Sequence, residues 1–246
     1  MRTRYIIIIF VVFLIILYQV IQSNIHQSSQ WVNHFFEYFT NDPAVFNVMN
    51  FPWTANFRKN WKQIRDEYFQ HVKYNHVPLH REINNLIASC DTSDNWKTLY
   101  LRAFCADTDV SKKFPLTMNL INQVPCTTAF FSVLGPRAKL QPHVGLYKGV
   151  IRYHLGLIVP KEKEKCFLNV DGNILYWEEG SDLMFDDSFS HYVENNTDES
   201  RVILFLDIRR DFHNIFIDTI NSIFLRFIRS NDVLAETIRN ANQINH

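Results

Sequence analysis

Two histidines and one arginine in the second half of the chain are of residue types that hold a metal ion and a carboxylate. His143 opens a loop after a proline, and His191 follows the acidic turn Asp186-Asp187. Imidazole is a good ligand for divalent iron. Arg201 heads an apolar strand, where a guanidinium is costly to bury unless an anion accepts its hydrogen bonds. These residues indicate an iron site with a dicarboxylate beside it.

Three neighbouring positions bear on this interpretation. Arg152 and His154 lie two residues apart in an alternating strand, so both side chains project from the same face. Non-haem iron sites commonly add a carboxylate to two histidines, often two residues after the first histidine, and Gly145 stands there. The competing interpretation for each arginine is an ion pair with Asp186, Asp187 or Asp207. The residues alone favour the two interpretations equally.

The elements around these residues predict a mainly β protein. From Thr127 onwards apolar residues recur with a period of two, and Asp171-Gly172-Asn173 is a strong hairpin signal. Helical periodicity occurs at 60–72 and 215–228, and a second polar helix is expected to follow to about residue 241. We expect a double-stranded β-helix, that is, a jelly-roll or cupin-like double sheet with helical support. The expected strands are 130–134, 150–159, 167–170, 174–177, 183–185 and 201–208.

The N-terminus predicts a membrane segment. No residue from Tyr5 to Tyr18 is charged, and Arg2 and Arg4 precede this run. With the next few residues the run reaches the lower length limit for a spanning helix, and the basic residues favour a cytosolic N-terminus with the remaining chain on the lumenal or outer side. A cleaved signal peptide is the competing interpretation, although no small-residue cleavage site follows. We therefore expect a single-pass membrane protein with a signal-anchor.

Composition limits the other function classes. Lys and Arg number 25, as do Asp and Glu, so no net basic field supports binding to nucleic acid. His71, His76 and His80 lie close together beside a proline, but a solvated helix end and loop is a better interpretation than a metal cluster. The cysteines show no CxxC spacing, which disfavours a zinc ribbon or thioredoxin-like site and leaves disulfide pairing open: Cys90, Cys105, Cys126 and Cys166.

Several segments together carry a family resemblance. They include Thr128–Pro136, Pro142-His143-Val144-Gly145, Tyr147–Leu157 with its Arg152-Tyr153-His154 core, Trp177-Glu178-Glu179-Gly180, Phe185–His191 and Arg201–Asp207. In this order and spacing, the block from Trp96 to Asp211 closely resembles the aspartyl/asparaginyl β-hydroxylase family of iron(II)- and 2-oxoglutarate-dependent dioxygenases. The resemblance extends to bacterial membrane-associated members and to the related lipid A hydroxylases, and it covers roughly half the chain.

The resemblance implies a role for each matching residue. His143 and His191 match the two iron ligands, and Arg201 matches the arginine that pairs with the distal carboxylate of 2-oxoglutarate. Three positions match further contacts to this co-substrate: Ser132, Arg152 and His154. From the resemblance together with the hydropathy and periodicity, we expect an anchor at 1–22, a stem at 23–50, a dioxygenase domain at 51–212 with its core at 127–211, and a helical extension at 213–246.

The implied activity is hydroxylation of an unactivated C–H bond with Fe(II), 2-oxoglutarate and O2. The first hypothesis places this bond at a β-carbon of Asp or Asn in a peptide or protein. Hydroxylation of a lipid acyl chain is the alternative. Gly145 weakens it, because lipid A hydroxylases carry an acidic residue there, whereas animal peptidyl hydroxylases replace that ligand by water. Halogenation is a minor alternative. A non-catalytic binding module is a hypothesis of another class, and the retention of His143, His191 and Arg201 opposes it.

Overall fold

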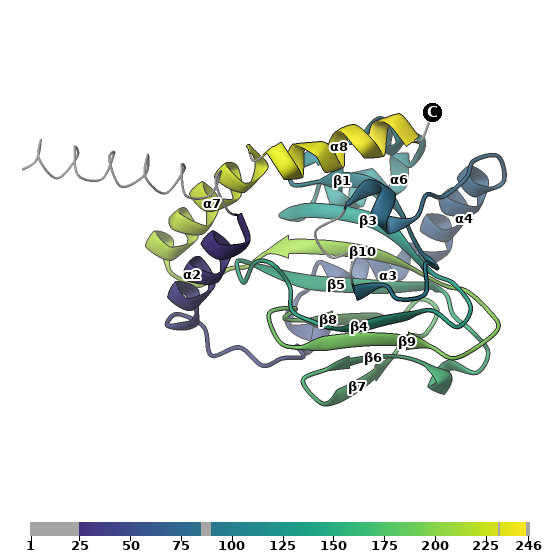
Figure 1. The fold of residues 1–246 in the computed structure, drawn as a ribbon, viewed down its shortest axis with the longest axis horizontal. Helices are drawn as coiled ribbons and strands as arrows, with labels where there is room; N and C mark the ends of the chain where they lie inside the picture. Colours follow the sequence, from purple (N-terminus) through teal and green to yellow (C-terminus); the bar gives the residue numbers. More distant parts are fainter. Residues whose placement is uncertain (1–24, 85–89, 231, 245–246) are drawn as a thin grey trace, which may run out of the picture.

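The structure is a computed structural model that describes residues 25–84, 90–230 and 232–244, and two β-sheets form its centre (Figure 1). The strands are β1 (Trp96–Ala103), β2 (Ala106–Asp107), β3 (Cys126–Leu134), β4 (Lys139–His143), β5 (Val150–Ile158), β6 (Cys166–Val170), β7 (Asn173–Tyr176), β8 (Asp182–Phe185), β9 (His191–Asn195) and β10 (Arg201–Arg209). A six-stranded sheet has the order β2-β1-β3-β10-β5-β8, and a four-stranded sheet has the order β4-β9-β6-β7.

The pairing confirms the predicted fold class of a mainly β, jelly-roll-like double sheet with helical support. Neighbouring strands of both sheets run antiparallel. The predicted hairpin joins β6 to β7, where Asp171 and Gly172 have φ of 49° and 84°. This left-handed backbone is what a two-residue hairpin turn requires, and glycine adopts it without steric cost. The alternating apolar pattern therefore located the strands predicted from it correctly. It did not predict β4 and β9, which are shorter and more polar.

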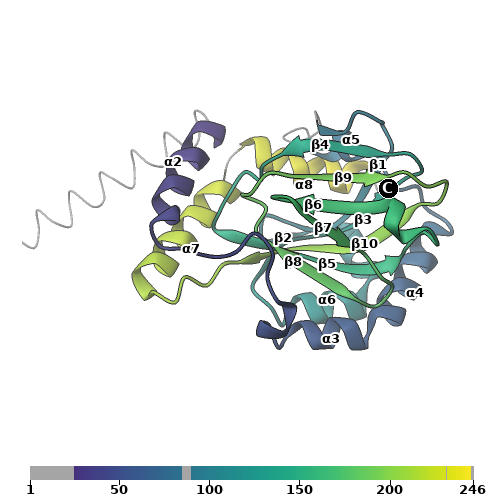
Figure 2. The ribbon, with the colours of Figure 1, turned by 90° about the horizontal axis from the view of Figure 1, so that it is seen from below.

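Apolar side chains pack on both faces of the six-stranded sheet. Between the two sheets, Trp96, Phe130 and Phe205 from one sheet meet Leu168 and Val193 from the other. The opposite face is covered by helices (Figures 1 and 2). These helices are α3 (Thr54–Lys59), α4 (Trp61–Val72) and α6 (Pro115–Ile121), and they contribute to a second buried cluster. The amphipathic helix predicted at 60–72 is α4, whose apolar stripe faces the sheet.

Two helices from opposite ends of the chain lie side by side at one end of the sheets (Figures 1 and 2). They are α2 (Ile25–Glu37) and α7 (Ile215–Arg229), and α8 (Asp232–Ile244) follows α7. Phe36 of α2 stacks on Phe212 with ring centroids 4.6 Å apart. Tyr147 contacts Phe36 and stacks on Phe224 of α7. These aromatic contacts hold the two helices against the loop between β4 and β5.

The predicted single-pass membrane location is wrong, because no helix in the described ranges is long and apolar enough to cross a bilayer. The longest is α7, with 15 residues. At about 1.5 Å per residue it reaches about 22 Å, short of the roughly 30 Å hydrocarbon core. The predicted anchor at 1–22 lies outside the described residues.

The expectation of a solvated region around the three clustered histidines is wrong for two of them. His71 is buried against Phe114, with ring centroids 5.3 Å apart. His80, at the start of the short helix α5 (His80–Ile83), is buried and stacks on Trp96 at 3.7 Å. The cause is tertiary, because the segment after Val77 folds back onto β1. None of the four cysteines forms a disulfide.

Candidate active site

His143 and His191 come together at the end of β4 and the start of β9. The two residues are partners in the β4–β9 register, and their ring centroids are 4.3 Å apart. Each Nδ1 lies at hydrogen-bond distance from a backbone carbonyl two residues earlier, 2.7 Å to Gln141 and 3.0 Å to Phe189. A ring that donates from Nδ1 keeps the lone pair on Nε2 for a metal. The two histidines that the sequence suggested therefore lie together, and backbone carbonyls fix the orientation of their rings.

Burial keeps both imidazoles neutral. It lowers the pKa of His191 to about 3, with further lowering by the positive charge of Arg152. Burial also lowers the pKa of His143, although the hydrogen bond to Gln141 opposes this. Metal binding requires the unprotonated ring, so these shifts favour it.

A cavity of about 130 Å³ opens beside the two histidines, between the sheets. Arg201 lines it from β10 and His154 lines it from β5. Arg201 is 2% exposed and lies over the Trp177 ring at 4.5 Å, and no acidic partner occurs for it in the described part of the chain. The Nε of Arg201 has no hydrogen-bond partner. The two ring nitrogens of His154 and the Nε1 of Trp177 also lack partners.

Such a cluster of unpartnered donors is unusual in a folded interior. Each buried polar group without a partner costs roughly 1–3 kcal/mol. Burial also disfavours the charged form of Arg201 and lowers its pKa to about 10. Ser132 belongs to the cluster, since its hydroxyl accepts a 3.0 Å bond from Trp96 Nε1 and retains its own proton to donate. The arrangement matches a carboxylate-bearing molecule, which would satisfy several of these donors at once.

Arg152 differs from Arg201, because it forms the ion pairs that were the competing interpretation. Its guanidinium lies 2.6 Å from Asp187 and 3.1 Å from Asp207. A buried cation between two carboxylates is neutralised and held in place. The structure therefore separates two arginines that the sequence could not distinguish.

Asp187 is a site residue that the sequence analysis considered only as part of a turn and as a possible ion-pair partner of an arginine. A β-carbon added to Gly145 would come within 1.9 Å of Asp187 Oδ2, so Asp187 occupies the space of a side chain at that position. The Gly145 N–H also donates to the Asp187 carbonyl at 2.7 Å. Asp187 is 2% exposed, its Oδ1 has no partner, and burial raises its pKa against the opposing charge of Arg152. The acidic pair just before His191 was the signal that could have found it.

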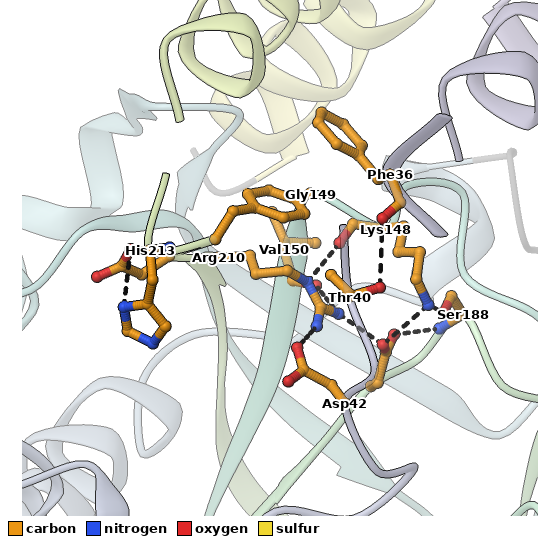
Figure 3. Close-up of polar contacts among 12 residues, drawn as sticks. Phe36, Thr40, Asp42, Lys148, Gly149, Val150, Ser188, Arg210 and His213 are labelled. Carbon is orange, nitrogen blue, oxygen red and sulfur yellow. Dashed lines mark hydrogen bonds and ion pairs between the residues drawn. The ribbon is translucent and has the colours of Figure 1, made fainter. Parts of the chain in front are cut away.

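A buried ionic network holds the turn before His191, and Figure 3 shows its contacts around Arg210, Asp42, Lys148 and Ser188. Asp186 is fully buried and accepts from Arg210 at 2.6 Å and from Lys148 at 3.3 Å. Burial alone would raise the pKa of Asp186, but Arg210, Ser188 and Lys148 together lower it below its usual value. Arg210 also pairs with Asp42. The network thus ties the turn to β10, to the loop before β5 and to the segment after α2.

Replacing Arg210 with methionine should destabilise the protein by about 3–5 kcal/mol, because it leaves the buried Asp186 charge short of its main partner. Chemical denaturation at neutral pH would measure this loss. Arg209→Met is the matched control, since Arg209 is exposed and its side chain donates to the Ser222 hydroxyl. We expect the control to change stability by no more than about 0.5 kcal/mol. Equal losses in both variants would contradict the role of the network.

Replacing His80 with phenylalanine should make the free energy of unfolding fall less steeply as the pH is lowered below about 6.5. Burial and the positive charge of Arg152 lower the pKa of His80 to about 3. Between pH 6.5 and 3 the unfolded chain therefore binds a proton that the folded chain does not, and stability falls as pH drops. Removing the group should reduce this slope by about 1.4 kcal/mol per pH unit. Denaturation at pH 6 and pH 4 tests this, with His76→Phe as the exposed control, and an unchanged slope would refute it.

Comparisons with known proteins identify the family of this chain. A family model described as aspartyl/asparaginyl beta-hydroxylase matches residues 58–211. An ornithine lipid ester-linked acyl 2-hydroxylase of Rhizobium tropici is 36% identical over 169 residues, which are 68% of this chain and 60% of that protein. Human aspartyl/asparaginyl beta-hydroxylase is 31% identical over 159 residues, which are 62% of this chain and 20% of that protein.

Among solved structures, a cupin 2 conserved barrel domain protein from Salinispora arenicola has a TM-score of 0.34 and 12% identity, covering 60% of this chain and 88% of that one. A likeness of this size adds nothing to the fold assignment, which rests on the two sheets. The match to the family model spans more than half of the chain and includes both histidines and Arg201. The chain belongs to the aspartyl/asparaginyl β-hydroxylase family, and the predicted resemblance is confirmed. It is thus related to hydroxylases of lipids as well as of proteins.

Proposed function

We propose that this protein is an iron(II)- and 2-oxoglutarate-dependent dioxygenase that hydroxylates a methylene group next to a carbonyl carbon. The observation that carries the proposal is Arg201, a buried cation without an acidic partner in the described ranges. It lines the same cavity as two histidines whose Nδ1 atoms face backbone carbonyls. Iron with O2 and 2-oxoglutarate would supply the oxidation, with one oxygen atom of O2 going to the new hydroxyl group and the other to succinate as CO2 is lost.

The residues present fit the co-substrate. Arg201 would hold its distal carboxylate with two parallel hydrogen bonds. Ser132 retains a hydroxyl proton to donate, since its oxygen accepts from Trp96. His154 is neutral, because burial and the neighbouring charge of Arg201 lower its pKa well below the usual value. It therefore has one N–H to donate and one lone pair to offer. His143 and His191 would hold the iron, and no third His, Cys, Asp or Glu in the described residues completes a metal-binding group with them.

The charges in the cavity favour an uncharged substrate group. Among the described lining residues the cations are Arg152 and Arg201. Arg201 is assigned to the co-substrate, and Arg152 is neutralised by Asp187 and Asp207. An anionic substrate side chain would thus find no unpaired cation there, whereas an acyl ester or amide needs none. We therefore favour hydroxylation of a lipid acyl chain at the carbon next to its carbonyl, as the name of the Rhizobium relative states for that protein.

The surface beside the cavity suits an amphiphilic substrate. Leu146 lines the cavity, and the Asn33 side chain of α2 donates to its carbonyl at 3.2 Å. The helix α2 therefore lies against the loop that follows His143. Together α2, the residues just after it, and α7 expose large apolar side chains: Trp31, Phe35, Tyr38, Phe39, Ile215, Phe216 and Ile220.

The second candidate substrate is an Asp or Asn residue of a peptide. Its β-carbon is also a methylene next to a carbonyl, so the same site geometry serves it. The observation in its favour is Gly145, the residue expected of animal peptidyl hydroxylases, together with the similarity to the human enzyme.

An anaerobic titration of the full chain with Fe(II) and 2-oxoglutarate tests the proposal. We expect the visible charge-transfer band of the chelated complex, and its loss in His143→Ala. Aerobic assays should then show succinate release with an ester-linked acyl lipid and less with an Asp-containing peptide. Peptide-dependent release alone would select the second candidate. Folded protein without a band would instead support a binding module on the same fold.

A further inference from the structure

His80 is a cavity residue for which the proposed function has no role. It reaches the cavity from α5, outside the strand-rich block, and is 2% exposed. Its ring stacks on Trp96, with centroids 3.7 Å apart and planes at 18°. The Nδ1 atom lies 3.3 Å from the Thr98 hydroxyl, whereas Nε2 is buried and has no partner. One face and one nitrogen of the ring are thus held by the protein, and the other nitrogen is left to a ligand.

The placement of His80 separates it from the co-substrate donors. Arg201 and His154 line the cavity from β10 and β5. His80, Trp96 and Tyr100 line it from α5 and β1. The positive charge of Arg152 acts on His80, and His80 lines the same cavity as the histidine pair. The described residues that line the cavity on this side are mainly aromatic. None of them is an anion that would compete with a ligand for the hydrogen bond of Nε2.

The chemistry of the ring limits what it can bind. A neutral imidazole offers one N–H and one lone pair, and the Thr98 hydroxyl can satisfy the lone pair at Nδ1. Nε2 then carries the proton and donates. A neutral donor in an apolar setting suits a carbonyl oxygen and gives a carboxylate no ionic partner. Leaving such a donor buried and unpartnered is unfavourable unless a bound molecule accepts from it.

We propose that His80 positions the substrate, with its Nε2–H donating to the carbonyl oxygen of an acyl ester so that the adjacent methylene faces the histidine pair. This inference rests on the proposed function and names the specificity contact of the same site. Oxidation of the C–H bond does not itself require the neighbouring carbonyl. A donor placed for it therefore decides which methylene along a uniform acyl chain is oxidised.

The test compares His80→Phe with His80→Gln, using an ester-linked acyl lipid and its ether analogue, which lacks the carbonyl. Phenylalanine keeps the stack on Trp96 and removes the donor, whereas glutamine keeps a donor. In His80→Phe we expect an unchanged Fe(II)–2-oxoglutarate band and an approximately tenfold higher KM for the ester lipid. More succinate should form per hydroxylated product, and oxidation should spread to other carbons. His80→Gln should recover part of the loss. Wild-type protein should prefer the ester to the ether, and His80→Phe should not.

Each contrary result has a distinct meaning. If His80→Phe keeps the KM, the product position and the preference for the ester, the inference is overturned while the proposed function stands. Loss of the band in His80→Phe would also overturn it, because His80 would then act through the co-substrate site. If wild-type protein forms the band but leaves the ester lipid unoxidised, the acyl contact is wrong and the iron site remains. Absence of the band from wild-type protein would remove the proposed function itself.

Discussion

In the His191→Ala variant we expect the Fe(II)–2-oxoglutarate band to vanish and hydroxylation to fall by more than about a hundredfold. Loss of an outer partner of a metal ligand already costs 10–100-fold, and loss of one of two protein ligands should cost more. His191 is 2% exposed and held through Nδ1 by Phe189, so no neighbouring side chain takes over its position. Anaerobic absorption spectra and succinate assays on the same preparation measure both effects.

His76→Ala is the control for this variant, because His76 is exposed and lies outside the cavity. It should leave the band and the rate unchanged. His143→Ala should behave like His191→Ala, since the two residues are partners in one β-ladder. A His191→Ala protein that keeps both band and turnover would show that the metal is bound elsewhere.

Arg201→Gln should raise the KM for 2-oxoglutarate by at least about thirtyfold. Truncating one partner of a buried, hydrogen-bonded charge pair costs about 2–5 kcal/mol, and each 1.4 kcal/mol is a factor of ten. Steady-state kinetics with varied 2-oxoglutarate would measure the change. Arg137→Gln is the matched control, because Arg137 pairs with Asp198 on the surface, where both side chains are largely exposed. An unchanged KM in Arg201→Gln would mean that another group holds the distal carboxylate.

The same variant has a second, opposite expectation for stability. Without co-substrate, Arg201 is a buried cation whose burial lowers its pKa to about 10. Removing it should leave the free energy of unfolding unchanged or higher, whereas Arg210→Met lowers it. Thermal unfolding without ligand distinguishes the two arginines, and 2-oxoglutarate with Fe(II) should then stabilise wild-type protein more than Arg201→Gln. The contrast follows from their partners, since Arg210 meets Asp186 and Asp42.

Much of the fold was readable from the sequence because strand periodicity is local. The apolar pattern in Val150–Ile158 and Arg201–Arg209 predicted the strands, which are buried at nearly every position because both faces of the sheet are covered, and Asp171-Gly172 predicted its own turn. Residue type alone left both a ligand site and internal ion pairs open, and only the family resemblance assigned roles to His143, His191 and Arg201. The short polar strands β4 and β9 gave a weaker pattern, although they carry the two histidines.

Only the tertiary structure decided which charged groups meet. Arg152 and Arg201 look alike in sequence, yet one lies between Asp187 and Asp207 and the other has no acidic partner in the described ranges. His80 looked like part of a solvated loop, and folding onto β1 placed it in the cavity. The sequence determined the sheet and the kinds of donor along it, because periodicity and side-chain chemistry belong to single segments. The pairing of charges depends on contacts between segments far apart in the chain, and these exist only once the two sheets have packed.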